Sequence, residues 1–359
     1  MRNRTRSSAT ERIRHPHPTL EPELKPLIVR NSSRTKFKRC PRAYWWAYED
    51  GLAPRRASDP LVFGTWVHEA LAAWYCGPGK KRGPHPADIF SQISDSDLRS
   101  VKIESEEKED KYHSMQDLGV TLLEEYVNFY GRDENMLILK PEKTISFRIP
   151  IPGSKVRVQQ VGTVDGVYRD GMTGYAWLLE HKTAKTISTS HLSLDEQPST
   201  YLSTAERSLR RKGLLASDER IHGIMYNFLR KGLPDTRPID DEGYALNKNG
   251  SRSKTQPKPL FHRHPIHRTT KARKRFLNRL QQDARRMLDL RAEVAEHGES
   301  VIMKTPHWSC TRFCEFFGMC ELEENGGNWQ TYRDAMYVKR DPFIDHRKSS
   351  DEVSSFEFS

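Results

Sequence analysis

The sequence predicts an α/β protein in which a central mixed β-sheet is flanked by helices. Three observations lead to this prediction. Segments with a helical spacing of apolar residues fill the first third of the chain, compact or alternating apolar segments follow between residues 144 and 184, and helical segments return after them. Helices on both sides of a group of strands are typical of layered α/β proteins. At 359 residues the chain can bury a substantial core, as one large domain or two.

The first third is expected to be helical after a disordered basic arm at residues 1–26, which are rich in Arg, Ser, His and Pro. Asn31, Ser32 and Ser33 can cap a short helix, and Pro41 can open the next one. Helices are expected at 31–38, 41–51, 62–75 and 118–130, with a loop at 77–86 and a charged surface insertion at 95–113.

The middle of the chain carries the strand signals. Strands are expected at 144–151, 155–170 and 174–184, and Asp170-Gly171 supplies the turn chemistry that makes the last two a hairpin. The remaining expectations are a helix at 196–212, a strand at 222–232, a mobile loop or β-ribbon at 234–265, a helix at 269–296, a cysteine segment at 306–325 and a polar tail at 331–359.

Positive charge is concentrated in one segment. The chain has 59 Lys and Arg against 48 Asp and Glu, a formal net charge of +11. Residues 248–291 hold 14 of those bases and only two acids, a local +12, so the rest of the chain sums to about −1. Such a segment favours a polyanionic partner. A solvated helix surface is the alternative, but DNA backbone contact is the favoured interpretation, through Lys271, Arg273, Lys274, Arg275 and Arg279.

The five cysteines indicate a metal centre rather than disulfides. Their number is odd, no secretory signal is visible and no run of 18 apolar residues occurs, so we expect a soluble, cytoplasmic protein. Cys310, Cys314 and Cys320 lie within eleven residues, and Cys40 lies far upstream. Four thiolates suit either an iron–sulfur cluster or Zn²⁺, and spacing alone does not separate the two. Cys76 is expected to be a buried free thiol.

Two acids and a lysine form the candidate catalytic group. Asp165 precedes Glu180 by fifteen residues, and Lys182 follows Glu180 by two, at the end of an apolar strand. In a hairpin these residues can converge, and Glu180 and Lys182 share one strand face. Two carboxylates are a hard oxygen site for Mg²⁺ or Mn²⁺, which would activate water, while the ammonium would stabilise the developing oxyanion. Phosphodiester hydrolysis requires these groups.

Three further side chains are weaker candidates. His68 on a helix could be another metal ligand, and Gln197 and Tyr201, four residues apart, could orient substrate or Lys182. A lone helical histidine is more often structural, and an Asp followed by Glu-x-Lys is common on solvated strands. The chain has no G-x4-G-K-[ST] phosphate loop, so a helicase motor of that type is not expected.

Taken in order, these motifs resemble the RecB-type nucleases of the PD-(D/E)XK superfamily. The resemblance covers roughly residues 30–325 and is carried by SSRTKFKRCPRAYWW, FGTWVHEAL, VGTVDGVY, LLEHKT, QPSTY and CTRFCEFFGMC. More specifically, the chain resembles the iron–sulfur branch, which includes CRISPR-associated RecB-like exonucleases, their phage relatives and the AddB nuclease domain. It implies a restriction-endonuclease-like core at 27–330, with an N-terminal helical part and a C-terminal cluster lobe.

The resemblance also implies roles for individual residues. His68, Asp165 and Glu180 match the metal ligands, Lys182 matches the catalytic lysine, and Gln197 and Tyr201 match the Q-x3-Y motif. Cys40, Cys310, Cys314 and Cys320 match the ligands of a [4Fe–4S] cluster, with Zn²⁺ as the alternative. The family usually has two residues between the first two late cysteines, whereas this chain has three.

The sequence therefore predicts a metal-dependent DNA nuclease, and the resemblance implies an exonuclease on single-stranded ends in recombination, replication or repair. One alternative is an accessory nuclease subunit of a CRISPR-adaptation or helicase–nuclease complex. A second is a non-catalytic, zinc-type DNA-binding module, against which the intact Asp165, Glu180 and Lys182 speak.

Overall fold

The computed structural model describes residues 25–55, 59–100 and 106–344. The basic arm predicted at 1–26 lies outside this description, apart from its last two residues, and so does the end of the predicted tail, 345–359. None of the described helices is long and apolar enough to cross a membrane.

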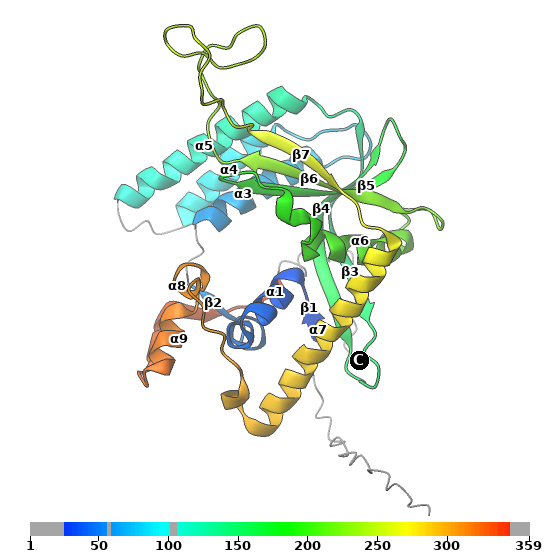
Figure 1. Ribbon diagram of the computed structural model, residues 1–359, viewed down its shortest axis with the longest axis vertical. Coiled ribbons are helices and arrows are strands. Elements are labelled where there is room, and N and C mark those ends of the chain that lie inside the picture. The colour runs from blue at the N-terminus through cyan, green and yellow to red at the C-terminus, as the bar shows by residue number, and fades with distance from the viewer. Residues whose placement is uncertain (1–24, 56–58, 101–105, 345–359) are drawn as a thin grey trace, which may run out of the picture.

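A six-stranded mixed sheet forms the centre of the molecule (Figure 1). β4 pairs with three other strands. It runs antiparallel to β3 along its length, parallel to β1 near its start and antiparallel to β5 near its end. β5 then pairs parallel with β6, and β6 antiparallel with β7. The strands are β1 (Leu27–Val29), β3 (Met136–Ile149), β4 (Val158–Asp170), β5 (Ala176–Ala184), β6 (Ile221–Arg230) and β7 (Phe261–Ile266).

The predicted hairpin is confirmed. β4 and β5 pair from Gly166 opposite Leu179 to Arg169 opposite Ala176. The Asp170 N–H donates to the Tyr175 carbonyl oxygen at 2.9 Å and closes the turn. Because this turn is local in sequence, its chemistry could be recognised without knowledge of the rest of the fold.

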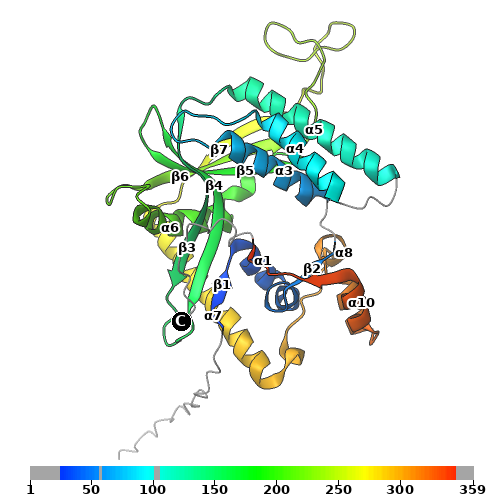
Figure 2. The ribbon, with the colours of Figure 1, turned by 180° about the vertical axis from the view of Figure 1, so that it is seen from behind.

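Helices cover both faces of the sheet (Figures 1 and 2). On one face, α3 (Asp59–Trp74), α4 (Pro86–Ser100) and α5 (Glu106–Tyr130) pack against the sheet. The helix predicted at 62–75 forms most of α3, and it buries an apolar stripe there: Phe63, Val67, Ala70 and Trp74. On the other face lie α6 (Glu196–Arg211), which buries Leu202, Ala205 and Leu209, and α7 (Thr270–His297). The α/β prediction is therefore confirmed.

The segment predicted to be a charged surface insertion, 95–113, is largely helical where the structure describes it. α4 and α5 occupy most of this segment and pack against each other. Phe90 is fully buried, and Tyr112 and Met115 pack on the same core, while the many charged residues lie on the outer helix faces. A high density of charge hid the amphipathic pattern, which needs only a narrow apolar stripe.

Segments near the two ends of the described chain build a lobe beside the sheet (Figure 2). The helix predicted at 41–51 is instead a short α-helix that widens into a π-helical turn, where the Asp50 N–H reaches the Trp45 carbonyl oxygen. The lobe contains α1 (Asn31–Arg39), α2 (Pro41–Tyr44), the π-turn η1 (Trp45–Glu49), β2 (Leu52–Pro54), α8 (Cys310–Phe313), α9 (Phe317–Glu324), α10 (Trp329–Met336) and β8 (Tyr337–Lys339).

Two predicted irregular segments contain regular structure. The polar tail expected from residue 331 includes most of α10 and all of β8, because β8 pairs antiparallel with β2 and buries Tyr337 against Phe316. The loop expected at 234–265 gives way to β7 at Phe261, which completes the sheet edge next to β6. Short 3₁₀ turns at Ser190–Ser193 and Glu299–Val301 complete the described elements.

Candidate active site

The site lies where β4 and β5 separate. Going from the turn toward the site, their pairing ends at Gly166 opposite Leu179, and Glu180 and Lys182 then pair only with β6 in the described ladders. On the same side of β4, the β1 pairing ends at Gln160. Residues 161–165 therefore border a gap between two neighbouring strands. Side chains from both helical layers can meet through this gap.

Asp165 is held from the α3 side. His68 on α3 places its Nδ1 3.0 Å from Asp165 Oδ1, and the His181 backbone N–H donates to Asp165 Oδ2 at 2.6 Å. Burial alone would raise the pKa of Asp165, but these two interactions and the His68 charge lower it to about 2. Asp165 is consequently a carboxylate at neutral pH. The same ion pair overcomes burial and raises the pKa of His68.

Glu180 is held from the α6 side. Its Oε1 accepts hydrogen bonds from Lys182 Nζ at 2.6 Å and from Gln197 Nε2 at 2.7 Å. Only 3% of Glu180 is exposed, and this burial raises its pKa, an effect that the Lys182 ammonium opposes and the Asp165 charge reinforces. Lys182 in turn has a raised pKa, because Glu180 outweighs the effect of burial.

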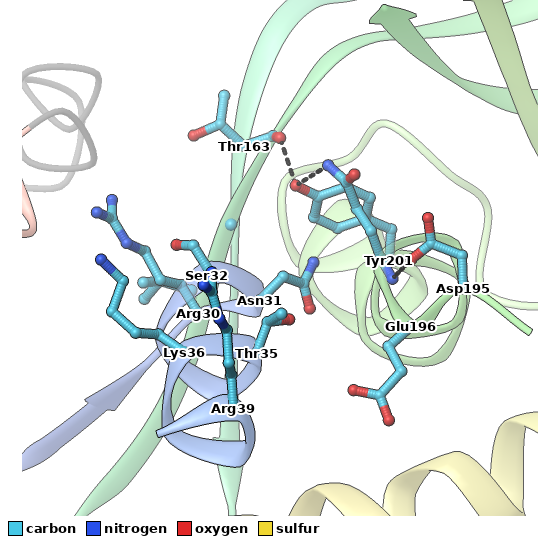
Figure 3. A pocket seen from close by; sticks show the side chains of 13 residues that line it. Arg30, Asn31, Ser32, Thr35, Lys36, Arg39, Thr163, Asp195, Glu196 and Tyr201 are labelled. Atoms are coloured by element: carbon cyan, nitrogen blue, oxygen red, sulfur yellow. Dashed lines mark hydrogen bonds between the residues drawn. The ribbon is translucent and has the colours of Figure 1, made fainter. Parts of the chain in front are cut away.

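Gln197 and Tyr201 tie the first turns of α6 to β4. Asp195 caps the helix by accepting from the Gln197 N–H at 2.9 Å, and the Tyr201 hydroxyl donates to the Thr163 carbonyl oxygen at 2.9 Å (Figure 3). The ring of Tyr201 crosses Gly162 so closely that a Cβ there would lie 2.7 Å from it. The spacing Q-x3-Y thus fixes α6 against the strand that carries Asp165.

All six predicted residues therefore lie in one neighbourhood. His68 and Asp165 make one hydrogen-bonded group, and Glu180, Lys182, Gln197 and Tyr201 make the other. The two groups are electrostatically coupled, because Asp165 acts on the pKa of both Glu180 and Lys182.

The donor set fits a divalent cation. Glu180 Oε2 is buried and has no hydrogen-bond partner within the described parts of the chain, as expected of an oxygen reserved for an ion. Asp165, Glu180 and His68 would supply hard oxygen and imidazole ligands. In the described ranges, no three His, Cys, Asp or Glu side chains are arranged to hold a metal together. His68 and Asp165 bond to each other, and Lys182 and Gln197 occupy Glu180 Oε1.

Two neighbours of the site were not found from the sequence. Glu142 on β3 lies between Pro141, opposite Gly166, and Lys143, opposite Val164; burial and the Asp165 charge raise its pKa. Glu142 lies just before the strand that was predicted to begin at residue 144, so no strand pattern or motif marked it out. His181, between Glu180 and Lys182, was not singled out either. Burial lowers its pKa to about 3, and its Nδ1 lies 2.8 Å from Asn227 Nδ2.

A cavity of about 550 Å³ opens beside this site (Figure 3). Its walls are one side of α1 along its whole length, residues 161–163 of β4, and Asp195 with the first turns of α6. Arg30, Lys36 and Arg39 contribute positive charge. Two acids, Asp195 and Glu196, also line the cavity, and Glu196 forms ion pairs with Arg34 and Lys38.

The five residues of α7 that were predicted to bind DNA differ in their exposure to solvent. Lys271, Lys274, Arg275 and Arg279 are exposed. Arg273 is half-buried instead: it donates to Glu206 Oε1 at 2.7 Å and to the Ile221 carbonyl oxygen at 2.9 Å. Because its guanidinium pairs with Glu206 on α6, Arg273 links α7 to α6.

Four cysteines line one cavity of about 300 Å³ in the lobe: Cys40, Cys310, Cys314 and Cys320. All are partly buried, and burial raises the pKa of Cys314 and Cys320. Cys40 and the late trio therefore converge from opposite ends of the sequence. Cys76 lies just after α3 and is exposed, so the expectation of a buried thiol was wrong, because the chain there enters a surface loop.

A protein-family model described as the PD-(D/E)XK nuclease superfamily matches residues 32–321. No curated protein matches the chain. Among solved structures, SSO0001 has 12% identity and a TM-score of 0.33, over 84% of this chain and 87% of that one. A Eubacterium rectale protein provisionally named an exonuclease has 10% identity and a TM-score of 0.40, over 80% of this chain and 92% of that one. At such scores these two likenesses carry no functional argument.

Proposed function

The chain belongs to the PD-(D/E)XK nuclease superfamily, and we propose that it hydrolyses phosphodiester bonds of DNA at the gap between β4 and β5. One observation carries the proposal. Asp165 and Glu180 approach each other with Lys182 alongside, and Glu180 Oε2 is left buried without a partner in the described structure.

The residues have distinct tasks in this mechanism. Asp165, Glu180 and His68 would hold Mg²⁺ or Mn²⁺, which supplies charge neutralisation and an acidified water when bound. Lys182 places an ammonium where negative charge develops on the phosphoryl oxygens. Gln197 orients the Glu180 carboxylate, and Tyr201 fixes α6 to β4 so that this orientation is kept. The exposed bases of α7 would contact the DNA backbone.

We further propose that the substrate is a single strand with a free end. The proposal rests on the resemblance of the motifs to RecB-like exonucleases. With Mn²⁺ present, linear single-stranded DNA should be degraded progressively, whereas a covalently closed circle of the same sequence should persist. Product lengths on a denaturing gel provide the measurement. Cleavage of the circle at the linear rate would make the protein an endonuclease, and inertness toward both would remove DNA hydrolysis altogether.

We also propose that the four-cysteine cavity holds a [4Fe–4S] cluster, with a structural role in joining the two chain ends. Four thiols around one cavity fit iron–sulfur or zinc ligation. The cavity sits between segments already linked by Arg39, which donates to the Phe313 carbonyl oxygen at 3.2 Å.

Anaerobically purified protein is expected to be brown and to contain iron and sulfide, because thiolate-bound iron clusters absorb visible light. Cys314→Ser should lose the colour and the iron, whereas Cys76→Ser should keep both, since Cys76 lies outside the cavity. Metal analysis and an absorption spectrum decide the point. One equivalent of zinc without iron would assign the site to Zn²⁺ instead.

A further inference from the structure

A second cavity, of about 470 Å³, lies between α6 and the edge strand β3. Arg148 on β3 and Arg207 and Arg211 on α6 contribute its charge, and Ser146, Phe147 and Pro150 complete its wall. None of the described residues that line it is acidic. Three guanidinium groups around one hollow form a concentrated positive site. This Arg148–Arg207–Arg211 cavity lies outside the candidate active site.

The three arginines serve no visible structural purpose. All are exposed, and within the described ranges of the chain none of their guanidinium groups has a hydrogen-bond or ion-pair partner. The neighbouring Arg210 behaves differently: its guanidinium donates to Glu206 and to the Glu219 carbonyl oxygen. Uncompensated guanidinium groups are well suited to phosphate, which accepts two of their hydrogen bonds at once.

α6 connects this cavity to the active site. Thr200, Arg207 and Arg211 recur at helical spacing and so share a face. The Thr200 hydroxyl bonds to Asn31 Oδ1 at 2.6 Å, and Asn31 lines the cavity of Figure 3. From Gln197 to Arg207 and Arg211 the helix rises about 15–21 Å. That length corresponds to about four to six nucleotides at the 3.4 Å spacing of a duplex strand.

We propose that the Arg148–Arg207–Arg211 cavity binds backbone phosphates of the substrate strand, about four to six nucleotides from the bond that is cut. The inference rests on the proposed function for its substrate. It adds a binding site on α6 and β3 to the basic surface of α7. The site holds the strand by charge and is indifferent to base sequence.

The test compares two triple variants with equal loss of charge. In the first, Arg148, Arg207 and Arg211 are all changed to Gln. In the control, Lys80, Lys81 and Arg132 are changed to Gln. These residues are exposed, and they lie in the loops that follow α3 and α5 rather than on α6 or β3. Binding of a fluorescent twelve-nucleotide single strand is measured by anisotropy in EDTA, from 50 to 200 mM salt.

Three phosphate contacts should contribute about 2 to the slope of log K against log salt, at about 0.7 per single-strand contact. The wild type and the control should therefore lose about 15-fold more affinity across this salt range than the arginine variant. Equal slopes for the arginine variant and the wild type would overturn the proposal.

The assay separates this inference from the proposed hydrolysis. Because binding is measured without divalent cations, a wild type that never cuts DNA can still show the arginine-dependent slope. Loss of cleavage with that slope intact would contradict the enzyme function alone. Normal cleavage with an unchanged slope would contradict the arginine site alone.

Discussion

Lys182→Ala is expected to lower the rate of DNA hydrolysis by about 10²–10³-fold, the usual cost of removing one preorganised group that stabilises transition-state charge. Lys182 Nζ lies 2.6 Å from Glu180 Oε1, so the variant also leaves that buried carboxylate without its cation. The rate of release of labelled nucleotides from linear single strands with saturating Mn²⁺ is the measurement.

Lys185→Ala is the matched control. Lys185 is exposed just beyond the end of β5, so its loss should leave the rate within about twofold, as for a solvated surface charge. A Lys182→Ala protein that melts like the wild type and still cuts at the wild-type rate would remove the lysine from the mechanism. Equal losses in both variants would point to general charge rather than to this position.

Arg34→Met is expected to destabilise the fold by about 3–5 kcal/mol, because it leaves a buried charge without its partner. Arg34 is fully buried and joins three helices: it donates to Asp283 Oδ2 on α7 at 2.7 Å and to Glu196 Oε2 on α6 at 3.0 Å. Asp283 is only 7% exposed and would keep just the more distant Lys38, at 3.6 Å. Urea unfolding, followed by circular dichroism, measures the loss.

Two comparisons make this result specific. Arg333→Met removes a solvent-exposed ion pair with Asp334 and should cost less than about 1 kcal/mol. The double variant Arg34→Met/Asp283→Leu should recover much of the lost stability, since the stranded carboxylate is gone. If Arg34→Met unfolds at the wild-type urea concentration, the buried bridge does not hold the three helices together.

The features that the sequence predicted well depend on short-range information. The β4–β5 hairpin follows from a turn of a few residues, and the hairpin by itself brings Asp165 near Glu180 and Lys182. The Q-x3-Y spacing is likewise local, because residues four positions apart lie on the same face of a helix. His68 was only a weak candidate until the resemblance supported it, because a helical histidine carries no local signal of the strand that it will contact.

The features that were missed depend on partners far away in the sequence. β8 forms because β2, almost 300 residues earlier, offers an edge to pair with. Arg34 meets Asp283 across 249 positions, and no local pattern marks either residue. α4 and the first half of α5 were missed for another reason, since their apolar stripe is narrow and surrounded by charge.

The pairing register of β4 and β5 also limits which insertions the turn between these strands can accept. Side chains alternate along a strand, so one residue inserted between Gly171 and Tyr175 that shifted β5 against β4 would send Glu180 and Lys182 to the wrong side of the sheet. Pairs of inserted residues would restore the alternation but move both groups along the strand by about 7 Å. The length of one surface turn is therefore tied to chemistry that takes place at the other end of the hairpin.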